Sequence, residues 1–107
     1  MVTSNPDQYL SNIFKALANP LRIYILRLLR NGPLCVCEII DSLGAEQSNT
    51  SQHLSVLKSA GLLESHKEGL KVIYNVKYHE VFSVLDTIES IIFAQTEDTI
   101  NALKSIL

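Results

Sequence analysis

Two cysteines, Cys35 and Cys37, are the residues of this 107-residue chain that most directly suggest chemistry. Thiolates are soft ligands that bind thiophilic metals and metalloids, and the dipole of a helix N-terminus lowers a thiol pKa. One intervening residue is too short a spacing for an ordinary structural disulfide. The pair therefore predicts a site for an ion such as As(III) or Cd, a thiol sensor of oxidation, or a purely structural role.

The spacing of the two cysteines restricts how they can act together. Positions i and i+2 of an α-helix point roughly 200° apart. Both sulfurs can reach one ion only if Cys35 lies at or before the helix cap, or if the first turn is distorted.

A polar segment, Gln47 to Gln52, is the second candidate for chemistry. Asn and Gln side chains can read adenine in the major groove, and Ser or Thr can bond bases or phosphates. Taken alone, the segment is equally typical of a solvated helix face. The surrounding elements favour DNA reading.

Those elements begin with an apolar stripe at helical spacing, formed by Leu10, Ile13, Phe14 and Leu17. Asn19 and Pro20 then predict a helix start, since Asn is a good N-cap and Pro a good first helical residue. This second helix is expected to reach about Arg30, with Arg22, Arg27 and Arg30 directed to water. Its expected buried residues are Leu21, Ile25, Leu28 and Leu29.

A helix-turn-helix is predicted next. A short helix is expected from Cys35 to Leu43, ended by Gly44, and another from Gln47 or Ser48 to Ala60, ended by Gly61. Only a three- or four-residue turn separates them, which is typical of a helix-turn-helix. Leu54 and Leu57 are expected to face the core.

Beyond Gly61 the pattern predicts a β-hairpin, with partly alternating residues on both sides of the charged turn 67–70. A long helix with a broad apolar arc is expected to follow. The predicted fold is mainly α with a small β-hairpin, a winged helix-turn-helix of order α-α-α-α-β-β-α in one domain, 1–107. Its expected parts are the helix-turn-helix (about 35–60), the wing (about 62–76) and dimerisation helices (about 8–18 and 78–105).

The net charge of −2 does not by itself favour nucleic acid, but its distribution matters more. Residues 47–79 carry four lysines against two glutamates and are the only net basic stretch. We expect base or phosphate contacts from Gln47, Ser48, Asn49 and Gln52, and phosphate contacts from Ser51 and Lys58. Further candidates are His53, at the edge between core and groove, and the wing residues His66, Lys67 and Lys71.

Three ordered motifs resemble the ArsR/SmtB family of metalloregulators. They are LANPLR at 17–22, LCVCEI at 34–39 and SQHLSVLKSAGLL at 51–63. The resemblance spans about residues 10–95. It implies a homodimer joined by its first and last helices, and a repressor that leaves a palindromic operator in double-stranded DNA when it senses a ligand.

The sequence departs from the family's metal-site patterns. Ile40 stands where the arsenic-sensing pattern adds a third cysteine, and the N-terminal arm has no cysteine. The last helix has Asp86 and Glu89 but no histidine after His79, which argues against the family's zinc site there. A soft metal at Cys35 and Cys37 would therefore need a ligand from a partner chain, water or a small thiol.

The sequence also allows two functions other than a ligand-responsive repressor. A winged helix can mediate protein contacts, and a regulator can act without sensing through its cysteines. An enzyme is not expected, because the sequence has no phosphate-binding loop and no nucleophile with a matching base. The sequence also predicts no membrane partner and a cytoplasmic location, since it has no long apolar run or signal pattern.

Overall fold

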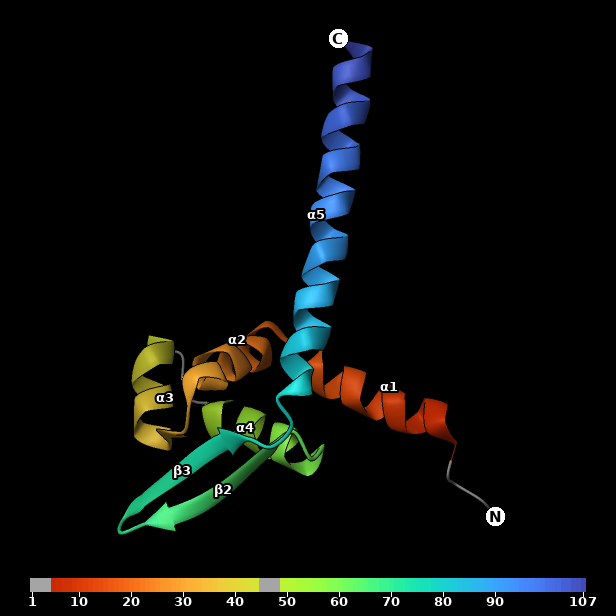
Figure 1. Cartoon of the computed structure of the whole chain (residues 1–107). Coiled ribbons are helices and arrows are strands. Elements are labelled where there is room, and N and C mark those ends of the chain that lie inside the picture. Colours follow the sequence, from red (N-terminus) through yellow and green to blue (C-terminus); the bar gives the residue numbers. More distant parts are fainter. Residues whose placement is uncertain (1–4, 45–48) are drawn as a thin grey trace.

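The computed structural model describes residues 5–44 and 49–107. Three helical elements come first, α1 (Pro6–Leu17), α2 (Pro20–Leu28) and the 3-10 turn η1 (Leu29–Asn31). They are followed by β1 (Leu34–Cys35), α3 (Val36–Leu43), α4 (Thr50–Ser59), β2 (Leu63–Glu68), β3 (Lys71–Val76) and α5 (Glu80–Ile106). The helices and sheet form one body from which α5 projects (Figure 1).

Local caps begin and end several helices where the sequence predicts. The Asn19 side chain accepts hydrogen bonds from the backbone amides of Leu21 and Arg22, at 2.9 and 3.3 Å, and Pro20 is the first residue of α2. At the end of α4, the amide of Leu62 donates to the carbonyl of Leu57. Gly61 has φ +81°, a left-handed conformation that glycine adopts without strain.

The predicted helix-turn-helix is confirmed. Helix α3 ends at Gly44, and α4 crosses the body below α2 (Figure 1). The predicted start of the second helix at Gln47 or Ser48 lies outside the described residues. Within them, α4 runs from Thr50 to Ser59 with Asn49 at its N-cap.

The predicted two-stranded hairpin is incomplete. The sheet has three antiparallel strands in the described part of the chain, in the order β1-β3-β2. In β1, Leu34 pairs with Tyr74 and Cys35 with Ile73. A two-residue strand is too short to show alternation, so its pairing depends on where the tertiary fold places β3.

The wing is tighter than the sequence predicts. Glu68 pairs with Lys71, which leaves Gly69 and Leu70 as a two-residue turn. Gly69 has φ +63°, as expected for glycine at the first central position of a type II′ turn. Lys67 and Glu68 therefore belong to β2 and not to the turn.

The core lies between α1, α2, α3, α4, the sheet and the start of α5. Ile25, Leu29, Leu54 and Leu57 are buried in it, as predicted. Leu21 is 38% exposed, so its predicted burial is wrong, and Leu28 is only half-buried. Leu26 is buried in their place.

Two arginines of the α2 region bind the last helix, which corrects the expectation that they point only to water. Arg27 pairs with Glu89, and Arg30 binds Asp86 through two nitrogens at 3.0 and 3.2 Å. The Arg30 guanidinium lies 5.0 Å from the centre of the Phe82 ring. Its hydrogen bonds to Asp86 lower the pKa of that carboxyl and raise the pKa of Arg30.

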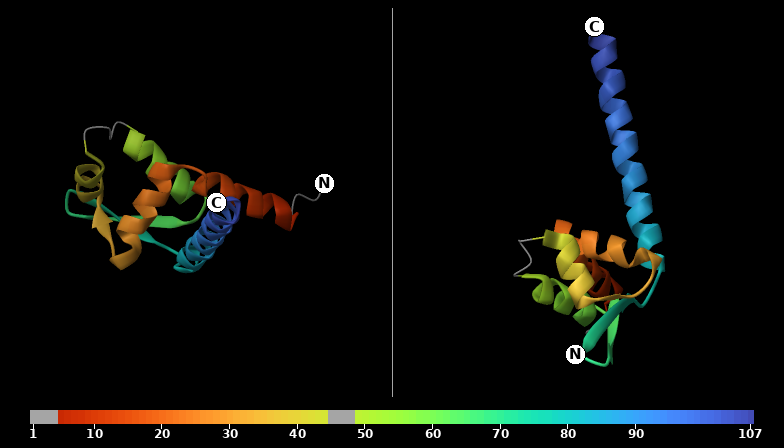
Figure 2. Two further views of the ribbon diagram at one scale, coloured as in Figure 1. Left: turned by 90° about the horizontal axis from the view of Figure 1, so that it is seen from above. Right: turned by 90° about the vertical axis from the view of Figure 1, so that its left-hand side faces the viewer.

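Helix α5 is anchored only at its beginning. Val81, Phe82 and Leu85 are buried, whereas every residue after Ser90 is exposed in the single chain. The rest of the helix extends away from the body, as the right-hand view shows (Figure 2). No helix among residues 5–44 and 49–107 is long and apolar enough to cross a membrane.

Candidate nucleic-acid interface and cysteine site

The first turn of α4 has an exposed side and an anchored side. Asn49, Ser51 and Gln52 are exposed, while the buried Leu54 and Leu57 hold the helix in the core. His53 is half-buried. The predicted contacts Gln47 and Ser48 lie outside the described residues. The described part of α4 therefore presents amide and hydroxyl groups from a helix with a fixed position.

Lys58 connects α4 to the wing. Its ammonium group donates a hydrogen bond of 2.8 Å to the hydroxyl oxygen of Ser65 on β2. Both side chains are accessible, so this contact orients Lys58 on the surface. No local pattern in the sequence links Ser65 to α4, so the sequence alone does not predict this contact.

The wing places its candidates on different faces. Successive residues of a strand point to opposite faces, so Lys67 shares a face with Ser65, the side of the sheet that meets α4. His66 lies on the other face, where its ring nitrogen is 2.8 Å from a carboxylate oxygen of Glu68. Lys67 thus lies on the face that continues the surface of α4, and His66 does not.

Cys35 caps helix α3. Its backbone is extended, with φ −74° and ψ 157°, and its sulfur accepts a 3.2 Å hydrogen bond from the amide of Glu38. The Glu38 carboxylate accepts in return from the amide of Cys35, at 3.0 Å. This is a capping box with cysteine in the usual place of Ser or Thr. The spacing Cys-x-x-Glu was the signal for Glu38, which the sequence analysis missed.

The two cysteines form a disulfide, and the expectation that they are too close for one is wrong. Cys35 lies before the helix, so the 200° separation of helical positions i and i+2 does not apply to it. The Cα atoms of Cys35 and Cys37 are 5.2 Å apart, within the usual disulfide range. The condition for a joint role, Cys35 at the cap, is met.

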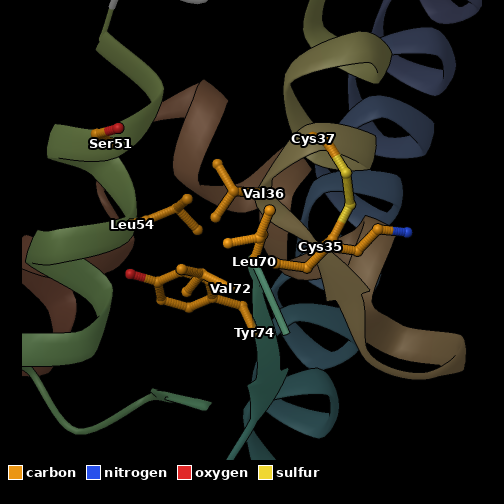
Figure 3. A pocket seen from close by; sticks show the side chains of 9 residues that line it. Cys35, Val36, Cys37, Ser51, Leu54, Leu70, Val72 and Tyr74 are labelled. Carbon is orange, nitrogen blue, oxygen red and sulfur yellow. A yellow bond between two sulfur atoms is a disulfide. The ribbon is translucent and has the colours of Figure 1, made fainter. Parts of the chain in front are cut away.

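A cavity of about 430 Å³ lies beside this disulfide (Figure 3). Its wall includes residues of β1, α3, α4 and β3, so the helix-turn-helix and the wing meet at it. The lining residues are Cys35, Val36, Cys37, Ser51, Leu54, Leu70, Lys71, Val72 and Tyr74.

As a metal centre the pair is incomplete. Its two sulfurs are close enough to bind one ion, and both would be soft ligands once reduced. Across the described ranges, however, no group of three or more His, Cys, Asp or Glu residues could hold a metal. The donor set seen here does not fit a closed thiolate site without a ligand from elsewhere.

Comparison with known proteins identifies the family to which this fold belongs. The family model for the bacterial regulatory proteins of the arsR family matches residues 19–65. An uncharacterized HTH-type transcriptional regulator of Methanocaldococcus jannaschii is 39% identical over 82 residues, 76% of this chain and 92% of that protein. The repressor SmtB of Mycobacterium tuberculosis is 39% identical over 77 residues, 71% of this chain and 57% of that protein.

Among solved structures, the solution structure of a homodimeric winged helix-turn-helix DNA-binding domain from Mycobacterium bovis, a possible ArsR-family regulator, superposes with a TM-score of 0.75. It is 27% identical and covers 92% of this chain and 95% of that domain. The fold and the family match together define a winged helix-turn-helix transcriptional regulator. The chain belongs to the arsR family, as its three motifs predict.

Proposed function

We propose that the protein is a homodimeric repressor of operator DNA whose affinity depends on the state of Cys35 and Cys37. The observation that carries the DNA assignment is the exposed polar start of α4, held by Leu54 and Leu57 and connected to the wing by Lys58. A helix placed in this way is suited to the major groove.

In this proposal the groups are divided by role. Asn49 and Gln52 contact bases or phosphates, together with Gln47 and Ser48, which lie outside the described residues. The phosphate contacts come from Ser51 and Lys58. His53 lies at the edge of the groove, and the wing contributes Lys67, with His66 and Lys71 on its other face.

Replacement of Gln52 by Ala is expected to weaken binding to the specific operator by roughly 5- to 150-fold, the equivalent of losing one bidentate base contact of about 1–3 kcal/mol. Gel shifts over a range of salt concentrations measure this on operator and on unrelated duplex. Affinity for unrelated duplex is expected to change little, because phosphate contacts dominate there.

The matched control is Ser55→Ala, an exposed residue on the same helix one turn further on. It is expected to leave both affinities unchanged. If the unmodified protein binds no duplex even at low salt, the DNA assignment fails and a protein-interaction module becomes the better explanation.

The dimer is proposed from the exposed apolar residues of α1 and α5. Leu10 and Phe14 on α1 and Ile88 and Ile92 on α5 are all more than 40% exposed in the single chain. Grooves of about 260 and 350 Å³ flank Phe14 between these helices. The homodimeric M. bovis domain supports this assignment.

The effector proposal follows from the position of the disulfide. Cys35 belongs at once to β1, which pairs with the wing strand β3, and to the cap of α3, the first helix of the helix-turn-helix. A change in its sulfur therefore acts on both DNA-binding elements. Oxidation removes two protons and two electrons from the thiols, which a small-molecule disulfide accepts.

Reduction of the disulfide is expected to raise operator affinity by roughly 5- to 150-fold, the usual range of allosteric coupling. Fluorescence anisotropy with reduced and oxidised protein measures it, with arms that contain arsenite, Cd²⁺ or Zn²⁺ added to reduced protein. Cys35→Ser and Cys37→Ser are expected to bind as the reduced form does under all conditions.

The outcomes separate the alternatives. A response to metal alone assigns the pair to metal sensing and overturns the redox assignment. No response to any treatment makes the cysteines structural, while the repressor assignment stands on its own operator measurement.

A further inference from the structure

The Cys35–Cys37 disulfide is strongly asymmetric. Cys35 is 1% exposed, and its sulfur accepts the hydrogen bond from the amide of Glu38 at the start of α3. Cys37 is in the first turn of the helix and is exposed. An external reagent therefore meets the sulfur of Cys37 first.

We propose that Cys37 is the entry site for a low-molecular-weight thiol, which forms a mixed disulfide with Cys37 and releases Cys35 as a capped thiolate. This proposal rests on the proposed regulatory role of the pair. It adds which reagent reacts and which of the two cysteines that reagent attacks. Two separate features support it, the asymmetry of the bond and the cavity beside it.

The exchange balances without a further oxidant. The thiolate of the small molecule attacks the sulfur of Cys37 and forms a new S–S bond, while the Cys35–Cys37 bond breaks and its electron pair remains on Cys35. A leaving thiolate is expelled faster when its negative charge is stabilised. The Glu38 amide and the α3 dipole stabilise the negative charge at Cys35 and favour this direction.

A second thiol completes the reaction. It attacks the mixed disulfide at the sulfur of the small molecule, which leaves two protein thiols and a small-molecule disulfide. In the reverse direction, Cys35 attacks the mixed disulfide on Cys37 and closes the bond again. Cys35 is thus the resolving thiol, and Cys37 is the thiol that exchanges.

The neighbouring cavity provides room for the substituent of the small thiol. Its apolar wall includes Val36, Leu54 and Tyr74. Because Leu54 and Ser51 belong to α4, the bound substituent would contact the DNA-reading helix itself (Figure 3).

The test uses the full chain without DNA, so its result is independent of the repressor assignment. Oxidised protein is treated with glutathione, quenched with acid, and mapped by peptide mass spectrometry after alkylation in denaturant. The expected product carries glutathione on Cys37 and the alkyl group on Cys35.

Single-cysteine variants test the asymmetry directly. With oxidised glutathione, Cys35→Ser is expected to form its adduct about tenfold faster than Cys37→Ser, because only Cys37 is exposed. In denaturant the two rates should become similar.

An adduct mapped to Cys35, or equal rates for the two native variants, would overturn the proposal. If exchange occurs as expected but operator affinity ignores it, the chemistry stands and the proposed regulatory role fails.

Discussion

Phe14→Glu is expected to convert the dimer to a monomer and to lower operator affinity by roughly 10²- to 10⁴-fold. Phe14 is 51% exposed in the single chain and lies between the two apolar grooves formed with α5. A carboxylate there would lose its hydration in the interface, at a cost of several kcal/mol. A monomer contacts only one half of a palindromic operator. It therefore loses the gain in affinity from linked binding of two halves, which is about 10²- to 10⁴-fold.

Analytical ultracentrifugation and operator titration on one preparation measure the two consequences together. Tyr24→Glu serves as the control, since Tyr24 is an exposed aromatic residue of α2 outside both grooves. It is expected to leave the dimer intact. A Phe14→Glu protein that sediments as a dimer at micromolar concentration would contradict an interface built from α1 and α5.

Leu57→Ala is expected to lower the free energy of unfolding by about 2–5 kcal/mol. Leu57 is 0% exposed, and its carbonyl also accepts the hydrogen bond that ends α4. The smaller side chain leaves a cavity where α4 joins the core. Since single domains are stabilised by about 5–15 kcal/mol, the change is a large share of the total.

Urea unfolding followed by circular dichroism measures this difference at fixed protein concentration, because dimer formation adds to apparent stability. Ser55→Ala, exposed on the same helix, is expected to change stability by less than about 0.5 kcal/mol. A Leu57→Ala protein as stable as Ser55→Ala would show that α4 is not anchored through this residue.

Much of the fold follows from local chemistry that the sequence displays. Asn19 and Pro20 start α2, and Gly61 ends α4, because capping hydrogen bonds and left-handed backbone are decided by residues a few positions apart. Gly69 defines the wing turn in the same way, and the helical spacing of Leu54 and Leu57 already indicates which side of α4 is buried.

Local sequence patterns also predict part of the candidate site. The polar residues Asn49, Ser51 and Gln52 stand on the exposed side of α4, where the pattern predicts them. The requirement that Cys35 lie at the cap, derived from helical geometry, is met. The operator measurements proposed above test the roles of these residues in binding.

Other features exist only because distant segments meet. The pairing of β1 with β3, the ion pairs from Arg27 and Arg30 to α5, and the contact between Lys58 and Ser65 carry no periodic signal in the chain. The disulfide differs from these contacts because it joins residues that are close in the sequence. Its partners are two residues apart, yet the bond depends on the extended backbone of Cys35, which pairing with Ile73 helps to hold. Local sequence therefore determines where helices and turns begin and end, whereas the assembled sheet decides how the cysteine pair is oriented and what it touches.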